Sequence, residues 1–166
     1  MYRVAILTIS DRGARGERKD RSGPAVAEAI ASLPGAEVVA RAIVPDERPQ
    51  IEAALRQWVR EGVDLILTTG GTGMSPRDVT PEATRAVIDR EAPGFAEAMR
   101  ASSLAVTPHA MLSRAVSGLA GCTLIVNLPG SPKAARENLM TIIPALGHAL
   151  DKLRGDPSEC ATPQTP

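Results

Sequence analysis

Four runs of apolar, often β-branched residues most constrain what this chain can fold into. They span 3–9, 36–44, 63–69 and 122–128, with helical patterns between and after them. The last two are nearly continuous Leu, Ile and Val stretches, as in parallel strands covered on both faces. Strands that alternate with helices require right-handed crossovers. We therefore predict an α/β fold, a three-layer α/β/α domain with a mostly parallel central sheet.

Apolar residues at helical spacing predict five helices. Asp46 is a plausible N-cap for the second helix, which Gly62 ends. Thr80 has the character of an N-cap for the third. In the last helix, Pro144 should produce a kink or a split. The predicted helix starts are Ser22-Gly23-Pro24, Asp46, Thr80-Pro81-Glu82, Pro93-Gly94 and Ser131-Pro132.

The composition bounds the class of protein. A chain of 166 residues with 43% hydrophobic and 23% charged residues is an ordinary globular domain. Only 2% of the residues are aromatic, so the core must be aliphatic and platforms for stacking single-stranded bases are missing. The formal net charge is zero, which removes the electrostatic footprint of a DNA-binding protein. We therefore expect no nucleic-acid partner.

Features that the sequence lacks bear on where in the cell the protein is expected. No apolar run reaches about 18 residues, so no membrane span is expected, and the N-terminal run is too short for a signal peptide. Cys122 and Cys160 offer neither a disulfide framework nor metal-ligand spacing, and Cys122 is interpreted as a reduced core residue. We expect a cytoplasmic protein with one domain over 1–154 and a flexible tail over 155–166.

Every predicted strand ends in small, polar or acidic residues. In an open α/β sheet, ligands bind outside the carboxyl ends of the strands, so a site is expected at this edge. The residues that follow the four strands are Ser10-Asp11, Pro45-Asp46, Gly70-Gly71-Thr72-Gly73 and Pro129-Gly130-Ser131.

The glycine run has the character of an anion cradle. Glycines let backbone N–H groups approach phosphate oxygens, and Thr72 adds a hydroxyl. The run matches neither a Walker A loop nor the dinucleotide fingerprint, and a simple tight turn is the alternative. The turn Pro129-Gly130-Ser131 precedes a helix N-terminus, which favours anions, although it could also be an ordinary helix start.

Asp46 and Asp78 are the acids of interest. A phosphate-transfer site needs carboxylates that hold magnesium against a polyphosphate. The alternatives are that Asp46 only caps its helix and that Asp78 pairs with Arg77 or caps a turn. Asp20 could likewise be a solvated loop acid.

Two further groups of polar residues carry a weaker signal. Ser113 beside Arg114 could hydrogen-bond and neutralise a phosphate, although such pairs also occur on any solvated surface. His109 and His148 lack partners at metal-ligand spacing and are interpreted as structural.

In combination, these motifs strongly resemble the MogA/MoaB family, which includes the molybdopterin-adenylating G domains such as that of gephyrin. The resemblance covers roughly residues 3–154. The motifs that carry it are, in chain order, Thr8-Ile9-Ser10-Asp11, Asp20-Arg21-Ser22-Gly23-Pro24, Val44-Pro45-Asp46, Thr69-Gly70-Gly71-Thr72-Gly73, Arg77-Asp78-Val79-Thr80-Pro81-Glu82-Ala83, Pro108 to Arg114 and Asn127-Leu128-Pro129-Gly130-Ser131-Pro132.

The resemblance implies a usually trimeric α/β/α domain that binds molybdopterin and ATP. It implies transfer of AMP to the terminal phosphate of molybdopterin, with release of pyrophosphate. Asp46 and Asp78 match residues of the family that are implicated in catalysis or magnesium-dependent turnover. Ser113 matches a serine near the pterin phosphate, and Asp20 an acid at the nucleotide end. The run from Gly70 to Gly73 matches the nucleotide and phosphate loop.

We therefore expect a magnesium-dependent molybdopterin adenylyltransferase, a homotrimer that could meet the molybdate-insertion enzyme of its pathway. One alternative is a molybdopterin-binding protein without adenylylation activity. Another is a molybdate-insertion domain, which a free-standing chain of 166 residues disfavours. The residues predicted to bind substrate or nucleotide are Ser10, Asp20, Gly70, Gly71, Thr72, Gly73, Ser113, Arg114, Pro129, Gly130 and Ser131, and Asp46 and Asp78 are predicted to be catalytic and to hold magnesium.

Overall fold

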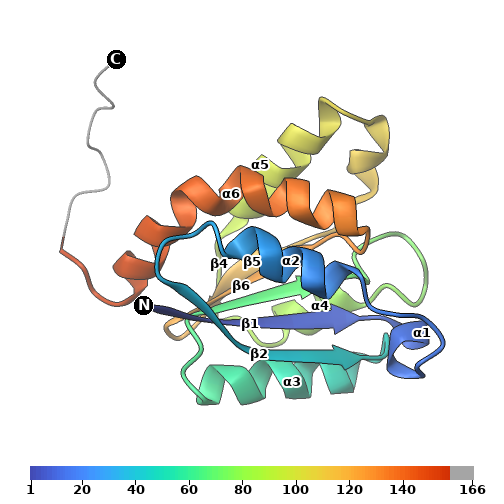
Figure 1. Cartoon of the computed structure of the whole chain (residues 1–166), viewed down its shortest axis with the longest axis horizontal. Coiled ribbons are helices and arrows are strands. Elements are labelled where there is room, and N and C mark those ends of the chain that lie inside the picture. The colour runs from blue at the N-terminus through green and yellow to red at the C-terminus, as the bar shows by residue number, and fades with distance from the viewer. Residues whose placement is uncertain (158–166) are drawn as a thin grey trace.

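A six-stranded sheet runs through the middle of the protein (Figure 1). The computed structural model describes residues 1–157. The strand order is β2-β1-β3-β6-β5-β4, in which the first four strands are parallel and the last two continue the sheet in antiparallel fashion. The strands are β1 (Tyr2–Ile9), β2 (Ala36–Val44), β3 (Leu65–Thr69), β4 (Arg90–Glu91), β5 (Ser117–Ala120) and β6 (Thr123–Leu128).

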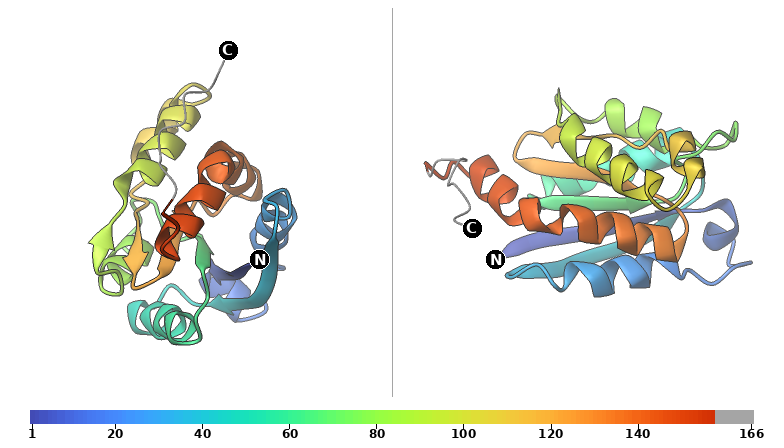
Figure 2. Two further views of the ribbon diagram at one scale, coloured as in Figure 1. Left: turned by 90° about the vertical axis from the view of Figure 1, so that its left-hand side faces the viewer. Right: turned by 90° about the horizontal axis from the view of Figure 1, so that it is seen from above.

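Helices cover both faces of the sheet. One face carries α2, α5 and α6, and the other carries α3 and α4, as the two turned views show (Figure 2). The predicted three-layer α/β architecture is therefore confirmed. The helices are α1 (Asp11–Ala14), α2 (Ser22–Ile30), α3 (Arg48–Arg60), α4 (Thr80–Arg85), α5 (Pro93–Leu104), a 3₁₀ turn η1 (Pro108–Leu112) and α6 (Pro132–Leu153).

The core consists of two apolar clusters separated by the sheet. Successive side chains of a strand point to opposite faces, so Val4 and Ile6 of β1 join one cluster while Ala5 and Leu7 join the other. As expected, the core is aliphatic, and Trp58 is the one aromatic side chain among the described buried residues. Packing against both clusters explains the continuous apolar runs in the sequence.

The four predicted strands match β1, β2, β3 and β6 to within two residues at each end. The sequence did not predict β4 and β5. β5 reads Ser-Gly-Leu-Ala, which lacks the β-branched residues typical of strands, and β4 has only two residues. Both strands are defined by pairing with a neighbour, β5 with β6 and β4 with β5.

Several local predictions are corrected. Asp46 does not cap α3, because the N-cap is Glu47, without a side-chain bond. Thr80 is the first residue of α4 rather than its cap, and its hydroxyl donates to the Gly70 carbonyl at 2.9 Å. α6 continues through Pro144, so the predicted split is wrong, and the kink stays a prediction. Cys122 is exposed rather than buried, because it lies in the β5–β6 turn.

The expected flexible tail lies mostly outside the described residues. The last helix, α6, ends at Leu153. Cys160 lies outside the described residues. Among residues 1–157, no helix is both long and apolar enough to cross a membrane.

The strand register places the ends of the four parallel strands at one edge, towards which β1 and β2 point in Figure 1. Ile9 is opposite Val44, Thr8 is opposite Thr69, and Thr69 is in turn opposite Leu128. The loops that follow these strands must therefore start side by side.

Candidate functional site

The loops after the parallel strands are joined to one another at the carboxyl edge of the sheet. The Ser10 N–H donates to the Val44 carbonyl at 2.9 Å, and the Gly70 N–H donates to the Leu128 carbonyl at 3.2 Å. The Thr69 hydroxyl donates to the Pro129 carbonyl at 2.7 Å. Residues that are more than a hundred positions apart in the chain thus form one surface.

The glycine turn requires glycine at its first two positions. Gly70 has φ of 104° and Gly71 has φ of 64°, in the left-handed region that glycine adopts without strain. A Cβ on Gly70 would lie 2.3 Å from the Ile9 carbonyl oxygen, and a Cβ on Gly71 would lie 2.3 Å from Thr80 Oγ1. The turn can therefore pack this closely only because both positions lack a side chain.

Asp46 and Asp78 both lie against this turn. Asp46 Oδ1 is 3.2 Å from the position of a Cβ on Gly71, and Asp78 Oδ2 is 3.0 Å from that of a Cβ on Gly73. The structure thus brings together two acids that are 32 positions apart in the numbering and the glycine turn between them. This convergence is the geometry on which a polyphosphate site depends.

Each of the two carboxylates uses one oxygen to hold its position. Asp46 Oδ2 accepts the Asp11 N–H at 2.9 Å, and Asp78 Oδ2 accepts the Ser75 N–H at 2.8 Å. Their Oδ1 atoms accept no hydrogen bond from the described part of the chain. Burial raises the pKa of Asp46, and the neighbouring charges of Asp11 and Asp78 act in the same direction. A cation between the two free oxygens would relieve this repulsion.

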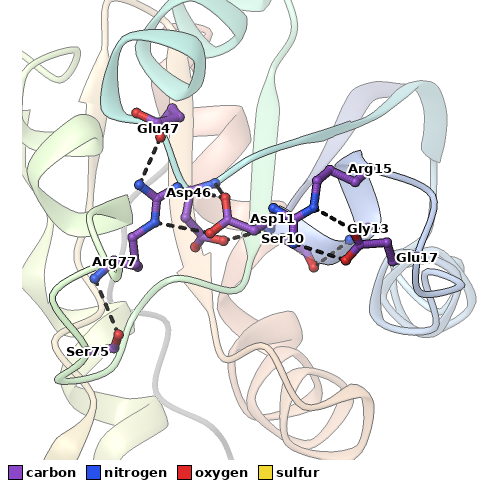
Figure 3. A network of polar contacts seen from close by, with 9 residues as sticks. All are labelled: Ser10, Asp11, Gly13, Arg15, Glu17, Asp46, Glu47, Ser75 and Arg77. Carbon is purple, nitrogen blue, oxygen red and sulfur yellow. Dashed lines mark hydrogen bonds and ion pairs between the residues drawn. The ribbon is translucent and has the colours of Figure 1, made fainter.

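Arg77 connects the loop after β3 to the loops after β1 and β2 (Figure 3). Its Nε and Nη2 donate to the two carboxylate oxygens of Asp11 at 3.1 and 2.8 Å, and its Nη1 donates to Glu47 at 2.8 Å. These bonds keep the pKa of Asp11 below its ordinary value. The alternative that Arg77 pairs with Asp78 is therefore wrong. The sequence assigned no role to Asp11 and considered Arg77 only as a partner of Asp78.

Asp20 is not a solvated loop acid. Its carboxylate accepts bonds from the Thr8 hydroxyl at 2.9 Å, the Ser22 hydroxyl at 3.2 Å and the Gly23 N–H at 3.0 Å. A Cβ on Gly23 would lie 2.4 Å from Asp20 Oδ2, so glycine is also needed there. Asp20 therefore ties the end of β1 to the first turn of α2.

Arg114 faces protein groups. Its guanidinium bonds to the Glu82 carboxylate and to the carbonyls of Gly73 and Asp78, and its backbone N–H donates to Thr72 at 2.9 Å. Arg114 holds the pKa of Glu82 below its ordinary value. The ion pair thus fastens α4 and the glycine turn together, a role that the sequence did not indicate.

Two cavities open at this edge. The larger, which we call the strand-end cleft, has a volume of about 530 Å³. The smaller, which we call the side pocket, has a volume of about 290 Å³. Gly70 and Gly71 of the glycine turn line the cleft, and the next two residues of the turn line the side pocket. The turn after β6 is divided in the same way, so the two cavities lie on either side of these two turns.

Of the residues predicted for the site, all except Arg114 line one of the two cavities. The side pocket also contains Arg100 and His109, which the sequence did not place in a site. The strand-end cleft is lined by Ser10, Asp20, Asp46, Gly70, Gly71, Asp78, Gly130 and Ser131, and the side pocket by Thr72, Gly73, Ser113 and Pro129.

The donor set of the cleft suits one kind of metal. Within residues 1–157 there is no group of three His, Cys, Asp or Glu side chains that could hold a metal ion by themselves. Magnesium is commonly bound by one or two carboxylates together with substrate phosphates and water. Asp46 and Asp78, each with one free oxygen, fit that mode and do not fit a closed structural metal site.

Comparisons with known proteins point to one family. Residues 5–148 match the family described as "Probable molybdopterin binding domain". Gephyrin of Dictyostelium discoideum is 43% identical over an alignment that covers 93% of this chain and 23% of that protein. A molybdopterin adenylyltransferase of Helicobacter pylori J99 is 42% identical over 92% of this chain and 88% of that protein. The chain spans about a quarter of the length of gephyrin and of the cinnamon protein of Drosophila melanogaster.

Solved structures agree with the sequence comparison. The crystal structure of MoaB from Thermus thermophilus has a TM-score of 0.89 at 57% identity, and the match covers 96% of this chain and 100% of that chain. MoaB from Pyrococcus furiosus, described as a tungsten cofactor synthesizing protein, has a TM-score of 0.83 at 35% identity over 92% of this chain and 97% of that chain. With its strand-end loops, its two cavities and these relatives, the chain belongs to the MogA/MoaB family.

Proposed function

We propose that this protein is a molybdopterin adenylyltransferase of molybdenum-cofactor biosynthesis, which transfers AMP from ATP to the terminal phosphate of molybdopterin and releases pyrophosphate. The observation that carries the proposal is the position of Asp46 and Asp78 against one glycine turn. Adenylyltransferase relatives that are 42–44% identical to most of this chain support it.

The two cavities suggest how the substrates are divided. We assign the ATP polyphosphate to the strand-end cleft and the pterin with its phosphate to the side pocket, where Ser113 lies. Their shared wall, the glycine turn, is then where the two phosphates meet. The terminal phosphate oxygen of molybdopterin attacks the α-phosphorus of ATP, and the bond from that phosphorus to the bridging oxygen of pyrophosphate breaks.

The chemistry needs little from a general base, because a phosphate oxygen is already a nucleophile at neutral pH. Catalysis comes from positioning and from neutralising charge. The Gly70 N–H is already bonded to Leu128, so the donors left for a phosphate are those of Gly71, Thr72 and Gly73, which donate to no group in residues 1–157. The N–H groups available to bind phosphate are therefore those of residues 71–73 and not that of Gly70.

Asp46 and Asp78 would hold magnesium through their free oxygens, together with the phosphates of ATP. A bound magnesium ion neutralises polyphosphate charge. The Asp11 N–H holds the Asp46 carboxylate, and Arg77 in turn binds the Asp11 carboxylate. Arg114, paired with Glu82, donates to the Asp78 carbonyl and so fixes the backbone that carries Asp78. We accordingly assign Arg114 to positioning rather than to direct phosphate contact.

The test is incubation of the protein with molybdopterin, magnesium and ATP labelled in the α-phosphate. We expect labelled adenylylated molybdopterin and an equal amount of pyrophosphate. Tight pterin binding without label transfer would instead favour the alternative, a molybdopterin-binding protein without adenylylation activity.

The assembly and setting of the enzyme belong to the same proposal. We propose a homotrimer in the cytoplasm that passes its product to the molybdate-insertion enzyme of the pathway. Exposed apolar side chains near the end of α5 and in η1 offer a surface for subunit contact; they are Leu104, Val106, Met111 and Leu112. Sedimentation equilibrium would give the number of subunits.

A further inference from the structure

A group of three cations lines the strand-end cleft together with its acids. Arg18, Lys19 and Arg21 lie on the loop between α1 and α2, and no other Lys or Arg occurs among the described residues that line this cleft. None of them lines the side pocket. The positive charge of the cleft is therefore concentrated on one loop, whereas the side pocket is lined by Arg100 from a different element.

These cations have no side-chain partner in the part of the chain that the structure describes. No hydrogen bond or ion pair joins the side chain of Arg18, Lys19 or Arg21 to any other residue in 1–157, whereas Arg15 on the same loop is paired with Glu17 at 2.8 Å. Asp20 is adjacent to them in the chain, but both of its carboxylate oxygens already accept hydrogen bonds from Thr8, Ser22 and Gly23. Three neighbouring positive charges repel one another, and an anion in the cleft would remove that cost.

The loop that carries the cations is anchored at both ends. At its start, the N–H groups of Glu17 and Arg18 both donate to the Arg12 carbonyl, at 2.9 and 3.2 Å. At its end, Asp20 is bonded to Thr8 and to the first turn of α2. The cations are thus presented to the cleft from a segment held by the fold, which reduces the cost of ordering them around a ligand.

The chemistry of the proposed reaction indicates which anion belongs there. In an in-line displacement, the leaving group departs on the side opposite the attacking group. If the attacking phosphate enters from the side pocket, pyrophosphate must depart into the strand-end cleft. The two carboxylates of Asp46 and Asp78 only balance the two positive charges of a magnesium ion between them, so the charge of this anion requires further cations that lie in the cleft.

We propose that Arg18, Lys19 and Arg21 bind the β- and γ-phosphates of the nucleoside triphosphate and therefore the pyrophosphate that leaves. This inference rests on the proposed adenylyl transfer, which determines the side on which pyrophosphate leaves. It assigns to this loop the discrimination between a nucleoside triphosphate and a monophosphate. AMP, which lacks both phosphates, gains nothing from the three cations.

The test uses inorganic pyrophosphate, ATP and AMP, titrated by calorimetry into the protein at fixed ionic strength and without molybdopterin. We compare the wild type with Lys19→Gln and Arg18→Gln, and with Arg15→Gln as a control that also removes one positive charge from the loop. Each of the first two variants should weaken pyrophosphate and ATP binding about tenfold. This factor corresponds to the lower end of the free energy that a hydrogen bond to a charged group contributes. AMP binding should change less than twofold, and Arg15→Gln should leave all three affinities near those of the wild type.

Pyrophosphate affinity that is unchanged in both variants would overturn the inference. An equal loss in Arg15→Gln would also overturn it, because it would show a general charge effect instead of a site. Since no pterin is present, these measurements do not depend on adenylyl transfer. Absence of transfer together with selective loss of pyrophosphate binding would reject the proposed function alone, whereas transfer with unchanged pyrophosphate affinity would reject this inference alone.

Discussion

Asp11 and Asp46 bind each other's backbone. The Asp11 N–H donates to Asp46 Oδ2 at 2.9 Å, and the Asp46 N–H donates to Asp11 Oδ1 at 3.0 Å. This reciprocal pair joins the loops after β1 and β2 and orients Asp46 so that Oδ1 remains beside the glycine turn. Arg77 then neutralises Asp11 through both of its oxygens, which allows two acids to lie so close together.

The first prediction concerns Asp78. Replacement Asp78→Asn removes a charge from the cleft but retains an acceptor for the Ser75 N–H, so the fold and pterin binding should persist. We expect turnover to fall about 10²–10³-fold, as when a single group that stabilises transition-state charge is removed. Steady-state kinetics with molybdopterin and ATP measure this, with the exposed Glu28→Gln as the control. Turnover near that of the wild type would remove Asp78 from the mechanism.

The second prediction concerns Arg77 as a positioning residue. Arg77→Gln breaks the bonds to Asp11 and Glu47 and loosens the loop that carries Asp78 relative to Asp46. The magnesium concentration for half-maximal turnover should rise severalfold, with a melting temperature close to that of the wild type, because exposed ion pairs add little stability. Arg77→Lys should restore only part of the loss, since lysine cannot bind both oxygens of Asp11 in a fork. An unchanged magnesium requirement would count against this role.

The third prediction concerns the glycine turn. Gly71→Ala places a Cβ 2.3 Å from Thr80 Oγ1 at a φ of 64°, so it should lower the free energy of unfolding by about 1–3 kcal/mol. The matched control is Gly94→Ala, because a Cβ there meets nothing within 4 Å in the first turn of α5. That variant should be neutral or slightly stabilising. Urea unfolding measures both, and equal effects would show that the turn is not constrained as described.

The fourth prediction is a dependence of stability on pH. Arg114 lowers the pKa of Glu82, so the ionised carboxylate stabilises the folded state above its ordinary pKa of 4.5, and this contribution is lost as the pH falls through the lowered pKa. The Glu82 side chain is 38% exposed, which limits the effect to about 1 kcal/mol. Glu82→Gln should therefore be less stable than the wild type at pH 7, and the difference should narrow towards pH 3.

Denaturant titrations at the two pH values provide the measurement for Glu82. Glu137→Gln is the control, because Glu137 only approaches Lys133 at 3.8 Å on the surface of α6. A difference between the wild type and Glu82→Gln that stays constant with pH would mean that the ion pair with Arg114 is not its source.

The architecture and the approximate place of the site could be predicted because both follow from local patterns. Continuous apolar runs indicate buried parallel strands, and parallel strands necessarily bring their carboxyl ends to one edge. Asp46, Asp78 and the glycine turn could therefore be grouped from the sequence. β5 could not be predicted, since its residues favour no strand and only pairing with β6 makes them one.

The sequence alone determined the three-layer fold, the aliphatic core and the set of loops that meet at the carboxyl edge. Only the tertiary structure decided which charges pair there: Arg77 with Asp11, 66 positions away, and Arg114 with Glu82, 32 positions away. It also divided the predicted residues between two cavities and left the side chains of Arg18, Lys19 and Arg21 without partners within residues 1–157. Strand and helix patterns are set by neighbours along the chain, whereas pairing between loops depends on distances that arise only when the sheet has formed.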